Sequence, residues 1–220
     1  MKILALLAAI LLPVSLVRAD ITIVQNVKQE GGSKGVDINM TIKVKDQKAR
    51  IDVNPDISTI VDLSSGDSLS LFHSRKAAMR LPGAAIKAMQ AKVQQEQGEL
   101  KADLPKATGR KETINGFACE EYETTVDGRK VELWLTKDAP DAQKALSQLS
   151  ALSGNGDPIS SFIEKNQLAG FPVRTVVDTP MGKVTTTVVT VKPGEIDATQ
   201  FTIPSEYKEV QAPAMPGVGK

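Results

Sequence analysis

The chain has 220 residues, of which 27 are Lys or Arg and 26 are Asp or Glu, and it contains one His, one Cys and one Trp. Both signs of charge are mixed along the chain, which excludes the clustered basic face of a nucleic-acid binder. The single cysteine excludes an intramolecular disulfide, so the stability of the fold must come from packing.

The first 19 residues have the pattern of a secretory signal peptide. Lys2 precedes an apolar run from Ile3 to Leu16, and Val17-Arg18-Ala19 then offers compact residues at the positions that a cleavage site requires. The run is shorter than the roughly 20 apolar residues that cross a bilayer as a helix. Asp20 rather than Cys follows the cleavage site, which argues against a lipid anchor. We therefore expect export, removal of residues 1–19, and no membrane span afterwards.

Alternation of apolar and polar residues dominates residues 20–82 and predicts a meander of six strands, each with one buried face. Two of these strands cover 38–45 and 49–54. The short polar connection Asp46-Gln47 predicts that they form an antiparallel hairpin with both apolar rows on one side. The other four strands are expected at 21–25, 57–63, 68–73 and 76–81.

The sequence offers no group that indicates catalysis. His73, the only histidine, ends one of these strands, where we expect a side chain that faces the turn or is hydrogen-bonded rather than a lone ligand. A Cys–His pair can form a nucleophile, but no orienting group lies at a recognisable spacing, so Cys119 is expected to be a small buried hydrophobe. Close carboxylates such as Asp62 and Asp67 are expected by chance. We predict no catalytic residue, no metal site and no cofactor, and a protein that is not an enzyme.

The period changes at Pro82-Gly83, where a helix is expected to begin. Residues 84–97 are rich in Ala, Lys, Gln and Glu, and Ile86, Met89 and Val93 recur at helical spacing. The polar face of this helix is not strongly basic and its stripe lacks an aromatic residue, so packing against the sheet is expected rather than a place on a membrane.

Strands resume at 111–114, 118–126 and 129–136. Asp127-Gly128 is the strongest hairpin signal in the chain, because a two-residue hairpin turn needs a positive φ at both central residues and Asp-Gly is a pair that accepts it. Trp134 falls opposite its apolar neighbours in the alternation. It is therefore expected to cover the second face of the sheet or to edge a cleft.

The last third of the chain predicts a second helix and a second hairpin. The helix is expected over 141–152, with Asp138 or Asp141 as its cap. Its apolar side would consist of Ala142, Ala145, Leu146 and Leu149. A loop at 153–158, a short helix at 159–166, a hairpin of 171–178 with 183–192, and a disordered tail at 211–220 complete the prediction, with residues 20–210 as one domain.

About ten strands in meanders, with helices inserted after the sixth and the ninth, predict an α+β fold that is mainly antiparallel β. One curved half-barrel sheet would carry helices packed on its concave face.

Several segments in this order resemble a known group of proteins. They are Met40–Lys45, Ile114–Phe117, Glu132–Lys137, Gly170–Val173 and Ile196–Tyr207. Through them the chain resembles an uncharacterised family of exported bacterial proteins, a domain of unknown function. Its layout is similar to the half-barrel of the periplasmic lipoprotein carriers of the LolA and LolB type. The resemblance implies a bacterial protein that is periplasmic or secreted.

In carriers of that shape, the concave sheet face accepts acyl chains. The resemblance therefore implies a protein that binds a hydrophobic ligand or a lipidated client, with an acyl chain, a lipoprotein or another envelope protein as its partner. The concave face would be lined by Ile42, Val44, Ile51, Val53, Val61, Leu69 and Leu71, and its lid would be formed by Ile86, Met89 and Val93.

The alternative is that the same residues fill a solid core. The protein would then be a structural or protein-interaction module of the envelope, without a small ligand and with an interacting sheet edge. The two hypotheses differ in whether the space between the sheet and residues 84–97 is hollow.

Overall fold

The computed structural model describes residues 20–31, 35–97, 101–152, 163, 168 and 170–211. The expected signal peptide at 1–19, the loop at 153–158, the short helix at 159–166 apart from Ile163, and the chain from residue 212 onward lie outside this part. None of the described helices is both long and apolar enough to cross a bilayer.

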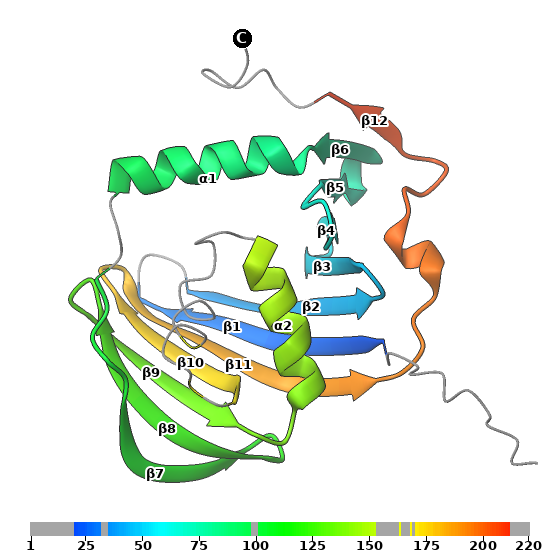
Figure 1. Ribbon diagram of the computed structural model, residues 1–220. Coiled ribbons are helices and arrows are strands. Elements are labelled where there is room, and N and C mark those ends of the chain that lie inside the picture. Colours follow the sequence, from blue (N-terminus) through cyan, green and yellow to red (C-terminus); the bar gives the residue numbers. More distant parts are fainter. Residues whose placement is uncertain are drawn as a thin grey trace, which may run out of the picture.

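One sheet of twelve strands curls into a half-barrel (Figure 1). The strands are β1 (Ile21–Glu30), β2 (Val36–Lys45), β3 (Lys48–Asn54), β4 (Ile57–Asp62), β5 (Ser68–Phe72), β6 (Ala77–Leu81), β7 (Lys106–Ile114), β8 (Phe117–Val126), β9 (Arg129–Thr136), β10 (Phe171–Thr179), β11 (Gly182–Pro193) and β12 (Lys208–Val210). The helices are α1 (Gly83–Gln97) and α2 (Pro140–Leu152), and the 3-10 turns are η1 (His73–Arg75) and η2 (Ala198–Phe201). The spatial order of the strands is β12-β6-β5-β4-β3-β2-β1-β11-β10-β9-β8-β7. Neighbouring strands are antiparallel except β12, which is parallel to β6.

The predicted α+β half-barrel is confirmed, with twelve strands in place of about ten. The six-strand meander, the helix after β6 and the helix after β9 all form where the sequence predicts them. The hairpin signal also holds, because Asp127 and Gly128 have φ values of 47° and 75°. Strand β12 escapes prediction because its three residues are all exposed and therefore carry no alternation.

The two faces of the sheet differ in charge. Helix α2 contacts β1 and β10 and marks the inner face, and cross-strand register carries this assignment from Ile21 to Val44 and on to Ala49. By the same register, every Lys, Arg, Asp and Glu of β1–β6, β10 and β11 lies on the outer face. The inner face of these strands is uncharged.

The buried core lies on the inner side of one part of the sheet. Ala142 and Ala145 of α2 are buried against Ile23 and Ile42, with Leu149 in the same cluster. The predicted apolar side of the second helix is thereby confirmed. The first hydrogen bond of α2 runs from the Gln143 amide to the carbonyl of Ala139. The helix therefore begins at neither of the two predicted caps, Asp138 and Asp141.

In the part of the sheet formed by β4, β5 and β6, the buried core lies on the outer side instead. There Ile60, Leu69, Leu71 and Ala78 are buried together with Ile196 and Phe201. The last two residues belong to residues 194–211, a segment that leaves β11 and returns across the outer face, as Figure 1 shows. We call this segment the strap. The packed core therefore changes sides of the sheet between β3 and β4.

Helix α1 crosses the open side of the half-barrel (Figure 1). It starts directly after β6, near one edge of the sheet, and leads to β7 at the other edge. At its base the Gly83 amide donates to Asp67 Oδ1 at 2.7 Å. A Cβ on Gly83 would lie 2.3 Å from the carbonyl oxygen of Ser65, so only glycine fits there. Beyond this base, α1 packs closely against none of the described helices and strands, which corrects the expectation that residues 84–97 pack against the sheet.

Gly128 and Gly182 both have positive φ, but only Gly182 lacks room for a side chain. A Cβ at Gly182 would lie 1.7 Å from the carbonyl oxygen of Glu30, whereas nothing lies within 4 Å of one at Gly128. We expect Gly128→Ala to lower the free energy of unfolding by about 1 kcal/mol, the cost of a left-handed backbone. Gly182→Ala should lower it by at least about 3 kcal/mol, because β1 must move. Urea denaturation measures both losses, and equal losses would contradict the close approach of β1 to the β10–β11 turn.

Candidate functional site

The inner face of β4, β5 and β6 is uncharged and mainly apolar, with Thr59, Ser68 and Ser70 as its hydroxyl residues, and no described helix packs closely on it. By register, Ile57 and Val61 of β4 point to the same side as Phe72 of β5 and as Met79 and Leu81 of β6. Each of the five side chains is partly buried, and none belongs to a buried cluster of the described residues. We call them the uncovered strip.

Helix α1 contributes further apolar side chains on the open side of the half-barrel. Ile86 is partly buried and Met89 is 40% exposed, and neither belongs to a buried cluster of the described residues. Among the described residues, these side chains of the helix therefore lie outside the packed clusters, just as those of the strip do.

Most of the residues predicted to line the concave face do lie on it, but in different environments. Ile42 and Val44 are buried against α2, and Ile51 packs at the edge of the same cluster, so these three belong to a solid core. Val53 is partly buried beside a register irregularity in β3, and Val61 belongs to the uncovered strip. The role of these residues in ligand binding stays a prediction, as does that of Val93, whose side chain is outside the described part of the chain.

Leu69 and Leu71 do not lie on the inner face, which corrects the prediction. Register pairs Leu69 with Ile60, and both leucines are buried beneath the strap on the outer face. The sequence misleads here because β4 carries apolar residues on both faces, Val61 on the inner and Ile60 on the outer. Alternation alone cannot show which row continues into β5.

A chain of hydrogen bonds on the outer face joins β3, β4 and η1 to the strap. Asp52 accepts from Lys43 Nζ at 2.9 Å, from Arg50 Nε at 2.6 Å and from Ser58 Oγ at 2.6 Å. Arg50 also donates to Ser58 Oγ at 3.0 Å and to the carbonyl of Gln200 at 2.8 Å. We call this cluster the outer clamp, which includes two further residues, His73 and Tyr207.

His73 links the two sides of the outer clamp. Its Nε2 lies 2.7 Å from Ser58 Oγ, and its Nδ1 lies 2.5 Å from the Tyr207 hydroxyl. Because Ser58 donates its proton to Asp52, Nε2 must donate to Ser58. Of the two predicted roles of His73, the hydrogen-bonded one is confirmed, and the partners lie 15 and 134 residues away in sequence.

The outer clamp contains Ser, His and Asp but does not form a nucleophilic triad. In such a triad the histidine accepts the serine proton, whereas the proton of Ser58 goes to Asp52 and the residue is 1% exposed. The polar groups of the clamp satisfy one another beneath the strap. The arrangement therefore holds the strap in place.

Burial raises the pKa of the Asp52 carboxyl, but hydrogen bonds from Ser58, Lys43 and Arg50 outweigh this effect and leave the pKa below its ordinary value. The carboxylate is therefore the stable form in the folded protein. Among the described residues, no group of three His, Cys, Asp or Glu is arranged to hold a metal ion.

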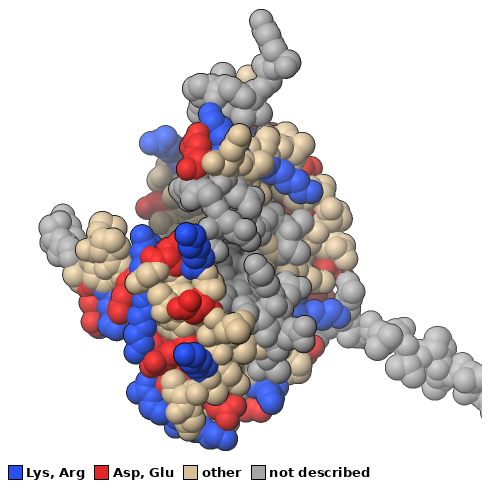
Figure 2. Space-filling view, turned by 60° about the vertical axis from the view of Figure 1, so that its left-hand side comes forward, with Lys and Arg blue, Asp and Glu red and all other residues tan. Residues whose placement is uncertain are grey.

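Trp134 pairs with Arg174 of β10 and therefore lies on the outer face of β9, opposite Leu133 and Leu135, in agreement with one of the two predicted placements. Trp134 is 7% exposed, and the guanidinium groups of Arg110 and Arg174 lie over its ring at 5.8 and 6.0 Å from the ring centroid. Charged side chains of both signs are interspersed on the described part of the surface in Figure 2, without a large patch of one sign.

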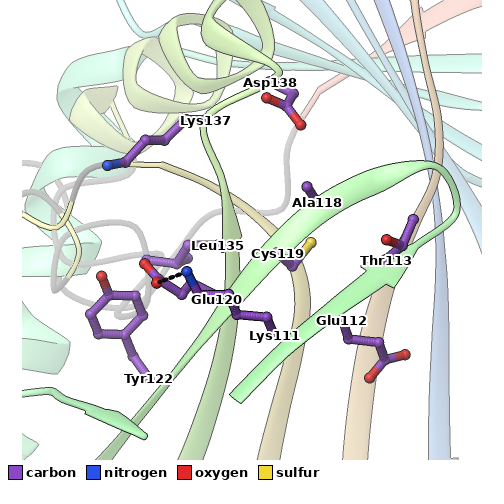
Figure 3. Close-up of a pocket in the computed structure, with 10 residues that line it drawn as sticks. All are labelled: Lys111, Glu112, Thr113, Ala118, Cys119, Glu120, Tyr122, Leu135, Lys137 and Asp138. Carbon is purple, nitrogen blue, oxygen red and sulfur yellow. Dashed lines mark ion pairs between the residues drawn. The ribbon is translucent and has the colours of Figure 1, made fainter. Parts of the chain in front are cut away.

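A cleft of about 450 Å³ lies beside the β7–β8 hairpin (Figure 3). Lys111 and Glu120 form an ion pair of 3.1 Å at its wall, and Lys137 and Asp138 come from the entry to α2. Cys119 is 3% exposed, donates to the Phe117 carbonyl at 3.3 Å, and has its thiol pKa raised by burial. These properties fit the predicted buried hydrophobe, and the hydrogen bonds of His73 go elsewhere, which excludes the Cys–His pair.

A comparison with protein families matches residues 27–207 to a domain of unknown function, DUF4412. The chain belongs to this family. The predicted membership in an uncharacterised family is thereby confirmed. A comparison with curated proteins found no match.

Several solved structures are similar to the chain. PNGF-II matches with 12% identity and a TM-score of 0.44 over 88% of this chain, which spans 32% of that protein. A LolA superfamily protein from Nitrosomonas europaea matches with 12% identity and a TM-score of 0.33, over 84% of this chain and 90% of that one. A DUF1329 family protein from Desulfovibrio piger matches with 13% identity and a TM-score of 0.36, over the same shares of 84% and 90%.

The lowered pKa of Asp52 predicts how stability depends on pH. The carboxylate stabilises the folded state fully above the unfolded pKa of about 3.9, and this contribution is lost as the pH falls through the lower folded pKa. Asp52→Asn should therefore lower the free energy of unfolding by roughly 2 kcal/mol at pH 7. The difference from the unmodified protein should shrink below about pH 4.

Urea denaturation across this pH range measures the difference. Asp56→Asn, at an exposed carboxyl on the β3–β4 turn, is the matched control and should change the free energy of unfolding by less than about 0.5 kcal/mol. A loss for Asp52→Asn that stays constant down to pH 2 would contradict the pKa assigned to Asp52.

Proposed function

We propose that this protein is an exported, periplasmic binding protein that holds a hydrophobic ligand, or the acyl chain of a lipidated client, on the uncovered strip beneath α1. The observation that carries the proposal is the uncovered strip on the inner face of β4–β6, whose five apolar side chains belong to no buried cluster of the described residues. The expected signal peptide supports the location. The protein is proposed to act by binding and not by catalysis.

The strip suits an acyl chain because its five side chains are apolar and the inner face around them, which also carries Thr59, Ser68 and Ser70, is uncharged. The register places no charged side chain on the inner face of β1–β6. An alkyl chain gains about 0.8 kcal/mol for each buried CH₂ group, and contact with the strip would also remove Phe72 and Met79 from water. A charged head group would find no partner on these strands and would stay outside.

The position of α1 favours a bound ligand over a filled core. A helix that packed on the strip would bury Ile86 and Met89, whereas Met89 is 40% exposed and α1 packs closely against no described strand. A chain-like ligand between α1 and the strip would cover both apolar surfaces at once. Helix α1 would then act as the second wall of the site.

The proposal predicts that protein purified under native conditions carries lipid. Organic extraction followed by mass spectrometry should detect a co-purified acyl-chain compound. The delipidated protein should bind N-phenylnaphthylamine, a neutral apolar fluorophore, and should take up an acylated peptide. The absence of co-purified lipid together with no binding of either compound would favour the envelope module with a filled core.

A matched pair of methionine variants locates the site. Met79→Gln places an amide on the strip, where burial beneath an apolar probe costs about 1–3 kcal/mol, so the Kd for N-phenylnaphthylamine should rise about tenfold. Met181→Gln makes the same change at a residue of the β10–β11 turn that is 67% exposed and should leave the Kd unchanged.

Val61→Thr keeps the shape of the side chain and provides a second substitution on the strip. Fluorescence titration gives the Kd of all three variants. Equal affinities for Met79→Gln, Val61→Thr and Met181→Gln would place the probe elsewhere and contradict the proposed site.

A further inference from the structure

We infer that the strap is the positioning element of the proposed binding face. Its docking on the outer side of β4, β5 and β6 holds the uncovered strip in place from behind, so strap docking and ligand binding are coupled. This inference rests on the proposed function and concerns the regulation of the same site.

The apolar contacts of the strap supply the core of these three strands. Strands β4, β5 and β6 have only six, five and five residues, and β6 is next to the edge of the sheet. Their buried side chains pack against Ile196 and Phe201, which are 6% and 5% exposed. On the inner side of the same strands, no described helix is packed. Among the described elements, the strap is therefore the layer that determines where these strands lie.

Polar contacts tie the strap down along its length. Near its start, the Ile196 amide donates to Asp20 Oδ2 at 2.8 Å, and Asp20 also pairs with Lys45 at 2.7 Å. In the middle, the Gln200 carbonyl accepts from Arg50. Near its end, Tyr207 bonds to His73, and β12 then pairs with β6. The outer clamp thus fixes the strap opposite the strip.

The strap and the strip meet through single strands. Ile60 and Val61 are adjacent in β4 and point to opposite faces, the first into the strap and the second into the strip. The same relation joins Ala78 to Met79 in β6. A strand that shifts on its outer side must carry its inner side chains with it, because the two rows share one backbone.

Thermodynamic linkage makes this coupling reciprocal. If a docked strap raises the affinity for a ligand by some factor, a saturating ligand must raise the docking equilibrium of the strap by the same factor. A strap that served stability alone would show neither effect. Measuring both the effect of the strap on ligand affinity and the effect of the ligand on strap docking therefore separates a positioning role from general stabilisation.

The test uses Tyr207→Phe, which removes the hydroxyl that bonds to His73 and keeps the ring. We expect the Kd for N-phenylnaphthylamine to rise three- to tenfold, and hydrogen exchange of the Ile196 and Lys208 amides to become faster. In the unmodified protein, saturating probe should slow the exchange of these two amides and leave the β7–β8 hairpin unaffected. Phe201→Ala, which removes a buried anchor of the strap, is the second variant and should raise the Kd further.

Two controls accompany these variants. Glu209→Gln changes an exposed residue of the strap and removes its ion pair with Arg80 of β6. It should change neither the Kd nor the hydrogen exchange of the strap amides. Gly128→Ala destabilises a distant turn and should leave the Kd unchanged, which shows that loss of stability alone does not weaken binding.

The inference is overturned if Tyr207→Phe and Phe201→Ala both keep the Kd within twofold of the unmodified protein, or if saturating probe leaves the exchange of the strap amides unchanged. If Met79→Gln weakens binding in the same series, the proposed function stands and only the coupling fails. If the unmodified protein binds no probe, the proposed function itself fails.

Discussion

Side chains of a strand point alternately to the two faces of its sheet, so a single covering layer can bury the side chains of only one face. In this sheet the covering layer lies on the inner face of one part and on the outer face of the other. Helix α2 covers the inner face around β1–β3 and β10, whereas the strap covers the outer face of β4–β6. The change of side leaves five apolar residues on the inner face of β4–β6 outside the buried clusters of the described residues. The rest of the architecture depends on this division.

The distribution of charge follows the same division. The outer face carries the charged residues of β1–β6, and those near the strap satisfy one another through Asp52, Arg50 and Ser58. Such a network is stable only when all of its members have partners. The strap supplies two of them, the Gln200 carbonyl and the Tyr207 hydroxyl. The inner face carries no charge on these strands, so contact with an apolar molecule requires no charge to be desolvated.

The sequence predicts the elements well because their signals are local. Alternation locates β2 and β3, the Asp127-Gly128 turn locates the β8–β9 hairpin, and the change of period at Pro82-Gly83 locates α1. Each of these signals involves residues that are close in sequence. The concave placement of Ile42 and Val44 follows from the same hairpin logic.

What the sequence does not predict depends on contacts between distant residues. Leu69 and Leu71 lie on the outer face because the strap packs there, and no local pattern shows where the segment around Ile196 and Phe201 will dock. The same holds for His73, whose partner Tyr207 is 134 residues away. The uncovered strip itself becomes visible only when both covering layers have been placed.

Methyl NMR spectroscopy of protein labelled at Ile and Met tests most directly whether the core changes sides and leaves the strip free. Titration with decanol, a neutral alkyl probe, should shift the methyl signals of Ile57 and Met79 and leave those of Ile23 and Ile42, which are packed against α2, unchanged. Shifts at Ile23 and Ile42, or shifts confined to Ile60 beneath the strap, would contradict the account.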